Sequence, residues 1–210
     1  MYCSTAQLCV KPDVPIGEFK DSIQHTLSQF SHNQVFNLSK NLEGSFGTGT
    51  YTCHFISLHT EEEIYQALIK LDTAIKIDLV THQTLAVGLR SPKLKRGIGR
   101  TLLLKVKDNA TEAQKDGLES DTLAMPDHLH GICNWSLSRT VNNHKWSHVW
   151  QQEYEEIDDL NGEYMMHPYH WAWVDRWFDC ENPDHCVEGD LCHAFYPIET
   201  SLLAAIDSAL

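Results

Sequence analysis

The first half of the chain alternates between two hydrophobic periods, which predict strands and amphipathic helices in a regular order. In residues 16–30 the large apolar side chains recur every three or four positions, the period of a helix with one buried face. Thr60 and Glu63 form a capping box, which is typical of a helix start. The glycine-rich stretch 44–49 precedes a strand pattern, and this predicts a turn rather than a phosphate loop. The predicted strands are 5–11, 34–42, 50–58 and 83–89, and the predicted helices are 16–30 and 60–75.

The second half repeats this pattern after a basic segment, 90–100, that proline and glycine interrupt as in a solvated connector. Thr111 and Gln114 again form a capping box, and 125–131 is interpreted as a loop carrying His128 and His130. The predicted strands are 100–108, 131–139, 145–154 and 191–198; the predicted helices are 111–123, 156–166 and a short terminal one over 199–210.

Each half therefore has the order β-α-β-β-α-β of a ferredoxin-like fold. The uncovered face of one such sheet is too apolar to remain in water, and two copies can pack these faces together as a barrel. We predict an α+β protein with two ferredoxin-like domains packed sheet to sheet within one chain. The predicted boundaries are 1–92 for the first domain and 98–210 for the second.

Composition and charge narrow the function classes. The 210 residues are 42% apolar and carry a net charge of −13, which makes nucleic acid and anionic membranes poor partners. No apolar run approaches the roughly 20 residues that span a bilayer, and the N-terminal residues lack the pattern of a signal peptide. Seven cysteines, an odd number, fit reduced thiols. We expect a cytoplasmic protein.

The segment "MMHPYHWAWVDRW" (165–177) holds the main candidate chemistry. Pro168 ends the preceding helix and starts another, so His167 becomes a junction residue whose side chain can cap the next turn. His170 falls on the apolar stripe of the second helix, where burial lowers the pKa of an imidazole and keeps it neutral. Such a histidine is either a general base or a core residue hydrogen-bonded to a carbonyl.

Four further residues form the predicted surroundings of this base. Tyr164 precedes the proline by about one helical turn, which lets its hydroxyl reach the same cleft. His148 is placed on a strand face with Trp146 and Trp150, a combination that suits the wall of a pocket for a planar ligand.

The second half resembles the Dabb family, the stress-responsive dimeric α/β barrels. The resemblance is carried by "LLLKVKDNATEAQKDGL", by "WSHVWQQEYEEIDDLNGEYMMHPYHWAWVD" and by "HAFYPIE". The plant polyketide cyclases of the olivetolic acid cyclase type are similar to it across this stretch. The resemblance implies that the two-chain barrel of the family is made within one chain, with 98–210 keeping the site and 1–92 serving as its partner scaffold. Further association of two such chains into a homodimer is left open by the sequence.

The same resemblance assigns roles to residues. It implies that His170 is the base, that Tyr164 hydrogen-bonds a substrate carbonyl, and that His148 is a third catalytic residue. We group Trp146, Trp150, His167 and Trp171 as ligand-binding residues. Thr101 stands where the cyclases have another histidine, a departure that leaves the substrate open.

The expected function is a cyclase or lyase acting on a polyketide-like or phenolic molecule, with neither metal nor organic cofactor. Three alternatives remain: a stress-response protein that binds a small aromatic ligand without turnover, a cofactor-free monooxygenase, and a metal-dependent enzyme. The metal alternative rests on the group Cys180, His185, Cys186, Cys192 and His193. Its spacing contains no CxxC pair, and the adjacent Cys192 and His193 point to opposite faces of a strand, so we expect no metal site.

Overall fold

The computed structural model describes residues 2–141, 143 and 145–209, without the side chains of 31–35 and 75. Eight strands form a single antiparallel sheet in the order β2-β3-β1-β4-β6-β7-β5-β8. The strands are β1 (Tyr2–Val10), β2 (Ser31–Lys40), β3 (Tyr51–Ser57), β4 (Ala74–Leu89), β5 (Lys95–Val106), β6 (Asn134–Thr140), β7 (His148–Tyr154) and β8 (Val187–Thr200).

The strand order shows the same topology twice. β1 to β4 are ordered as β4-β1-β3-β2 and β5 to β8 as β8-β5-β7-β6, so each half has the ferredoxin-like arrangement. β4 pairs with β6 and joins the halves. At the other end, the loop after β2 reaches β8, where Phe46 pairs with His193 and the Leu42 amide donates to the Phe195 carbonyl. The predicted fold, two ferredoxin-like domains packed as a barrel within one chain, is confirmed.

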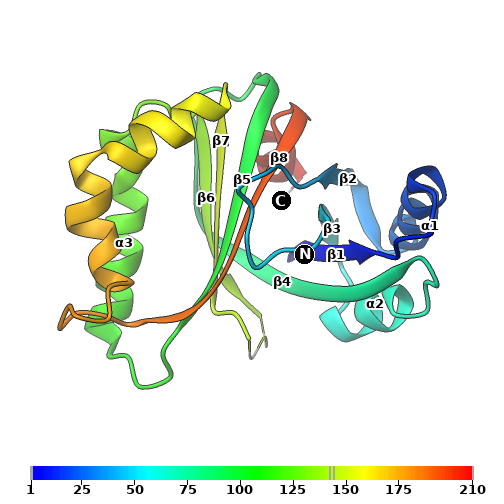
Figure 1. Ribbon diagram of the computed structural model, residues 1–210, viewed down its shortest axis with the longest axis horizontal. Helices are drawn as coiled ribbons and strands as arrows, with labels where there is room; N and C mark the ends of the chain where they lie inside the picture. The colour runs from blue at the N-terminus through cyan, green and yellow to red at the C-terminus, as the bar shows by residue number, and fades with distance from the viewer. Residues whose placement is uncertain (1, 142, 144, 210) are drawn as a thin grey trace.

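Helices cover the two outer faces of the barrel. α1 (Ile16–Ser28) and α2 (Glu61–Leu68) lie on the N-terminal half, and α3 (Glu112–His128) lies with the segment after β7 on the other half (Figure 1). The last helix, α4 (Leu202–Ala209), packs Leu202 and Ile206 against Cys3 and Ile56. Both predicted capping boxes are present at the starts of α2 and α3.

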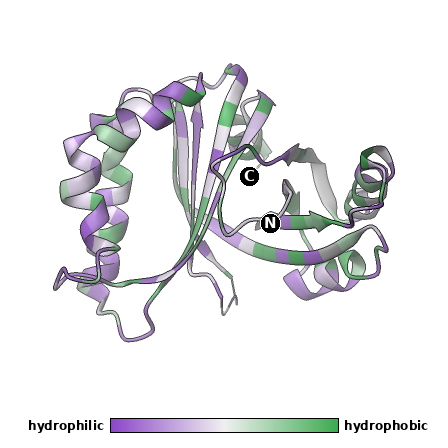
Figure 2. Cartoon of the chain, in the orientation of Figure 1, coloured by the Kyte–Doolittle hydropathy of each residue, from purple (hydrophilic) through white to green (hydrophobic). Residues whose placement is uncertain are grey.

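Hydrophobic and hydrophilic residues alternate along parts of the strands (Figure 2). Successive side chains of a strand point to opposite faces of the sheet, one toward the barrel interior and the other toward the helices. The interior contains a polar network in which the Thr5 hydroxyl lies 3.1 Å from His54 Nδ1 and 3.2 Å from His82 Nε2. The outer face of β1 and β3 is apolar and packs on Phe19, Ile23 and Leu27 of α1. The space under α1 and α2 is thus filled by side chains of the N-terminal half.

Several predicted boundaries are wrong. α2 ends at Leu68 instead of residue 75, because the alternating run from 74 onward belongs to the long strand β4. The basic segment 90–100 is only partly a connector, since β5 begins at Lys95. α3 continues through Pro126 to His128, so the loop predicted over 125–131 starts later.

The segment 156–178 has the predicted break: helical residues run from 157 to 166 and again from 168 to 177, with His167 between them. The type of helix differs from the prediction, because most of each piece is π-helical, in η1 (Asp159–Tyr164) and η2 (His170–Val174), and the second piece ends in a short 3₁₀ turn, η3 (Asp175–Trp177). Pro168 donates no backbone hydrogen bond, and the His170 amide donates to the His167 carbonyl at 3.0 Å. π-helical turns are rare and are found mostly near functional sites.

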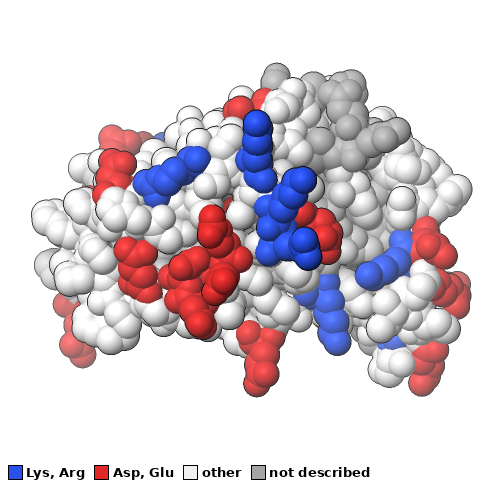
Figure 3. Space-filling model, turned by 90° about the horizontal axis from the view of Figure 1, so that it is seen from above, with Lys and Arg blue, Asp and Glu red and all other residues white. Residues whose placement is uncertain are grey.

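Charged side chains of each sign are grouped on the surface of the molecule, and no described helix is suited to a membrane. Seen from above, acidic side chains gather on the side of α3 and η1, next to a central group of basic ones (Figure 3). No helix in the described part of the chain has both the length and the apolar character needed to cross a membrane.

Candidate functional site

A cavity of about 260 Å³ lies between the outer face of the C-terminal half of the sheet and the helical layer that covers it. Its floor comes from β5, β7 and β8, and its roof comes from α3 and the π-helical segment. One residue of the N-terminal half, Phe46, also lines it. The lining residues are Phe46, Arg100, Leu102, Leu104, Thr122, Met125, Trp150, Tyr164, Met165, His170, Val174, Asp175, Phe178, Leu191 and His193.

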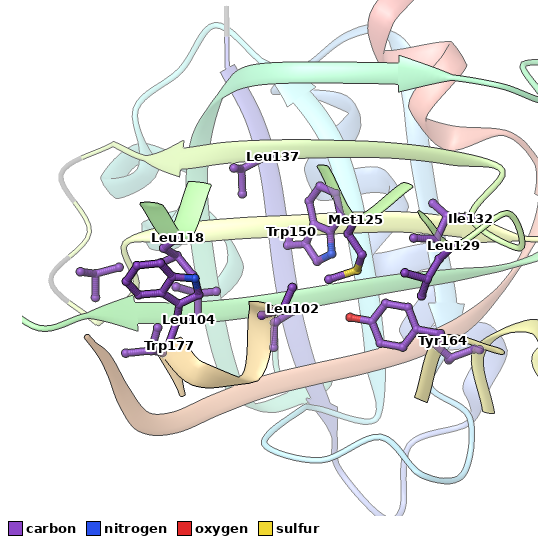
Figure 4. Close-up of a cluster of buried hydrophobic side chains, with 14 of the residues drawn as sticks. Leu102, Leu104, Leu118, Met125, Leu129, Ile132, Leu137, Trp150, Tyr164 and Trp177 are labelled. Carbon is purple, nitrogen blue, oxygen red and sulfur yellow. The ribbon is translucent and has the colours of Figure 1, made fainter. Parts of the chain in front are cut away.

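The cavity opens within the apolar core of the C-terminal half. Figure 4 shows Trp150, Met125, Leu102 and Tyr164 around one space, with the Tyr164 hydroxyl directed toward it. These side chains also belong to the core cluster between the sheet and α3. An apolar wall with a few convergent polar groups is typical of a small-molecule site.

His170 is the candidate base of this cavity. Its side chain is 12% exposed, and its Nδ1 lies 3.5 Å from the Asp175 carboxylate without hydrogen-bond geometry. Burial and the positive charge of Arg100 lower the pKa of His170 to about 4, so the imidazole is neutral at pH 7. A neutral imidazole near a carboxylate can accept a proton from a ligand.

Tyr164 and Arg100 flank the imidazole. The rings of Tyr164 and His170 have centroids 4.7 Å apart, and the guanidinium of Arg100 lies 4.7 Å from the Tyr164 ring centroid. Burial raises the pKa of the Tyr164 phenol, so it stays protonated and can donate a hydrogen bond. Tyr164 and Arg100 thus supply donors for an oxygen on which negative charge develops.

Arg100 is held from below by two side chains of the sheet. Its Nε donates to His193 Nε2 at 2.5 Å, and its Nη1 donates to the Gln152 side-chain oxygen. Burial, Arg100 and His170 lower the pKa of His193 to about 2, which keeps its Nε2 free to accept. His193 packs between the rings of Phe46 and Phe195.

The structure brings together some of the predicted site residues. His170, Tyr164 and Trp150 line the cavity. His167 lies at the helix junction, where its Nδ1 accepts from the Tyr169 amide at 3.1 Å, so its predicted capping contact is confirmed. It does not appear in the lining of the cavity.

Three other predicted residues lie elsewhere. His148 is on the helix-covered face, but its Nε2 is 2.9 Å from Glu119 and its Nδ1 is 2.8 Å from the Ser147 hydroxyl, in a separate cleft. Trp146 precedes β7, so strand alternation does not apply to it, and it packs inside the barrel with Val149. Trp171 is 57% exposed, and its indole nitrogen donates to the Met165 carbonyl at 2.7 Å on the surface of the π-helical segment.

Arg100, His193 and Phe46 were missed from the sequence. Arg100 belongs to a basic run, but it also shares its strand face with Leu102 and Leu104, and this alternation was the available signal. Thr101, where the cyclases have a histidine, faces the barrel interior and lies 2.8 Å from the Tyr196 hydroxyl.

The cysteine and histidine group considered for a metal is dispersed. Cys192 packs inside the barrel, whereas His193 lines the cavity outside it. The His185 Nε2 lies 2.7 Å from the Val187 carbonyl. Within the described residues, no three His, Cys, Asp or Glu side chains gather as a metal site.

The comparison with family models falls on the half that holds the cavity. Residues 98–183 match the Dabb family, the stress-responsive A/B barrel domain. The Dabb match runs from β5 to the turn after η3, and it therefore contains Arg100, Trp150, Tyr164 and His170. No curated protein sequence matches the chain.

Solved structures resemble the whole chain in fold. An anthrone oxidase-like protein superposes with a TM-score of 0.64 at 9% identity, over 93% of this chain and 90% of that one. A proposed monooxygenase from Fusobacterium nucleatum gives a TM-score of 0.60 at 9% identity, over 95% and 92%. A proposed monooxygenase from Lactobacillus acidophilus gives 0.56 at 9% identity, over 92% of each chain. At this identity the likeness shows a shared fold.

Proposed function

We propose that this protein is an enzyme that removes a proton from a planar, largely apolar carbonyl or phenolic compound, with His170 as the general base. The observation that carries this proposal is the neutral imidazole of His170 in an apolar cavity, with its Nδ1 facing Asp175. A carboxylate at this place favours the tautomer with the proton on Nδ1. Nε2 then carries the lone pair that accepts the proton.

The remaining groups would stabilise the product of this step. Loss of a proton next to a carbonyl leaves an enolate, whose negative charge lies largely on oxygen. The Tyr164 phenol and the Arg100 guanidinium, on adjacent sides of the His170 ring, would donate to that oxygen. In a cyclase or lyase reaction the carbanion form then attacks, or is released from, a second carbonyl carbon. The Dabb match over 98–183 covers the three residues to which this proposal gives roles, Arg100, Tyr164 and His170.

A cofactor-free oxygenase is the second candidate, and the likeness to an anthrone oxidase-like protein favours it. It would start from the same deprotonation. The carbanion would then react with O2: one oxygen atom becomes the new carbonyl, and the other leaves as water with the two hydrogens of the original methylene group. The product of anthrone would be anthraquinone.

The proposal can be tested without knowing the natural substrate. 2-Tetralone in deuterated buffer should exchange its acidic α-hydrogens faster with the protein than without it. His170→Ala should lose this exchange, while His167→Ala, which alters a histidine outside the cavity lining, should keep it. Equal exchange with the wild-type protein and His170→Ala would refute His170 as the base.

Oxygen consumption then separates the reactions. Consumption of O2 with anthrone, lost in His170→Ala, would favour the oxygenase. Proton exchange without O2 consumption would favour the cyclase or lyase. A bound ligand that neither exchanges nor reacts would identify a binding protein instead.

A further inference from the structure

Arg100 is a buried cation without an acidic side chain to balance it. Its exposed fraction is 3%, and no carboxylate of the described residues forms an ion pair with it. Asp175 lines the same cavity, but its side chain is half exposed and faces His170. A guanidinium is a fixed positive charge, so its burial without an anion is unfavourable.

The groups that hold Arg100 are neutral acceptors. Gln152 and His193 accept from two of its five N–H groups, and neither carries a negative charge. They fix the guanidinium at the floor of the cavity, and the fork retains N–H groups that are not used by these two side chains. A rigid fork of this kind matches the two oxygens of a carboxylate.

The same cavity holds another buried donor, and this one has no acceptor. Trp150 is 1% exposed, and its indole nitrogen has no hydrogen-bond partner among the described residues. In Figure 4 this nitrogen lies on the side of Met125, which also lines the cavity. A buried N–H without an acceptor is costly, so an acceptor oxygen from a ligand would satisfy it.

We infer that the ligand of this cavity is an aromatic or otherwise planar carboxylic acid, whose carboxylate pairs with Arg100 and whose ring system fills the apolar space. This inference rests on the proposed function and specifies its substrate class. The cavity volume of about 260 Å³ suits two or three fused rings. His170 would then act on a position of the ring system away from the carboxylate.

The test compares two probes of the same shape by calorimetric titration, 2-naphthoate and its neutral analogue 2-naphthamide. The wild-type protein should bind the carboxylate about tenfold or more tightly, as expected for hydrogen bonds to a charged group. Arg100→Met should abolish this preference, and Arg100→Lys should retain part of it. Equal affinity of the wild-type protein for both probes, or an unchanged preference in Arg100→Met, would overturn the inference.

Two controls make the result specific. If Arg100→Met does not fold, Arg100→Lys decides: it should weaken naphthoate binding and leave naphthamide binding unchanged, and a uniform loss for both probes would count against the inference. His170→Ala should keep the preference for the carboxylate. A protein that shows this preference but no proton exchange would refute the proposed enzyme and leave the ligand class standing.

Discussion

The aromatic ring of Tyr164 lies 4.7 Å, centroid to centroid, from the imidazole of His170, across the helix junction that Pro168 creates. Arg100 contacts the same tyrosine ring from the sheet. A base, a phenol and a guanidinium from three segments therefore meet in one apolar cavity. The geometry makes the contribution of each group separable by substitution.

Tyr164→Phe keeps the ring and removes only the hydroxyl. We expect the fold to persist and the proton-exchange rate with 2-tetralone to fall about a hundredfold, the usual effect of losing one donor to a developing oxyanion. Tyr154→Phe is a matched control, because Tyr154 is a buried tyrosine of the same core whose hydroxyl has no described partner. An equal loss of rate in both variants would mean that the effect is structural.

The titration of His170 provides a second prediction. Its pKa of about 4 results from burial first and from Arg100 second, so the ring should stay neutral from pH 8 down to about 5. Nitrogen-15 correlation spectra of the imidazoles, with His170 assigned by its loss in His170→Ala, should show this. Arg100→Met should raise the midpoint, because the cation is removed while burial remains. A wild-type midpoint near the ordinary value of ~6.5 would contradict the described environment.

The repeat of periods two and 3.6 was sufficient to predict the order of the elements along the chain and the barrel of two ferredoxin-like domains, because burial of alternate faces is a local property of each strand. It was insufficient for the site. Trp146 lies two residues before β7 and His148 is its first residue, so a pattern that treated them as one strand placed both on the same face. The π-helical form of η1 and η2 was also not predicted, because no local pattern of apolar residues distinguishes it from an α-helix.

The role of Arg100 could not be predicted from the sequence for a similar reason. Its neighbours in sequence made it part of a basic run, whereas its neighbours in space are Gln152, His193 and Tyr164. These three residues belong to β7, β8 and η1, which are far from Arg100 in the sequence and come close to it only in the folded protein. A side chain whose partners are all distant cannot be assigned from spacing.

The polar interior of the barrel predicts acid sensitivity. Burial lowers the pKa values of His54 and His82 to about 3, and His82 lowers that of His54 further. Unfolded, both histidines bind protons below about pH 6.5. As the pH falls, the unfolded chain therefore binds protons at these histidines before the folded protein does. The contribution of neutral His54 and His82 to the free energy of unfolding is fully present above about pH 6.5. It decreases as the pH drops toward 3, by at most about 1.4 kcal/mol per histidine and pH unit.

The free energy of unfolding in guanidinium chloride, measured at pH 7.5 and at pH 5, gives this loss of stability. The double variant His54→Gln, His82→Gln should lose less stability between these pH values than the wild-type protein. His148, His170 and His193 also have lowered pKa values and contribute in the same direction, so part of the loss should remain. An unchanged pH dependence in the double variant would exclude the barrel histidines as its source.

Phe46 tests whether both halves of the chain build the site. It is 50% exposed and lies at the cavity, where its backbone exchanges hydrogen bonds with His193 at 3.0 and 2.9 Å. Gly47 beside it has φ +65°, and a Cβ there would lie 2.0 Å from the Leu191 carbonyl oxygen, so the backbone fixes the position of this loop on β8. Phe46→Ala removes apolar contact but no backbone hydrogen bond. We expect naphthoate affinity to fall about three- to tenfold, and the free energy of unfolding to change by less than about 1 kcal/mol.

Tyr65→Ala is the control for Phe46, because Tyr65 is a partly exposed aromatic residue of the same half on α2, outside the cavity lining. It should leave naphthoate affinity unchanged. If Phe46→Ala also left the affinity unchanged, the ligand would contact the C-terminal half alone, and the N-terminal half would only close the barrel. A selective loss in Phe46→Ala would instead explain one benefit of a single-chain barrel: a loop that belongs to one half completes the wall of a cavity built by the other.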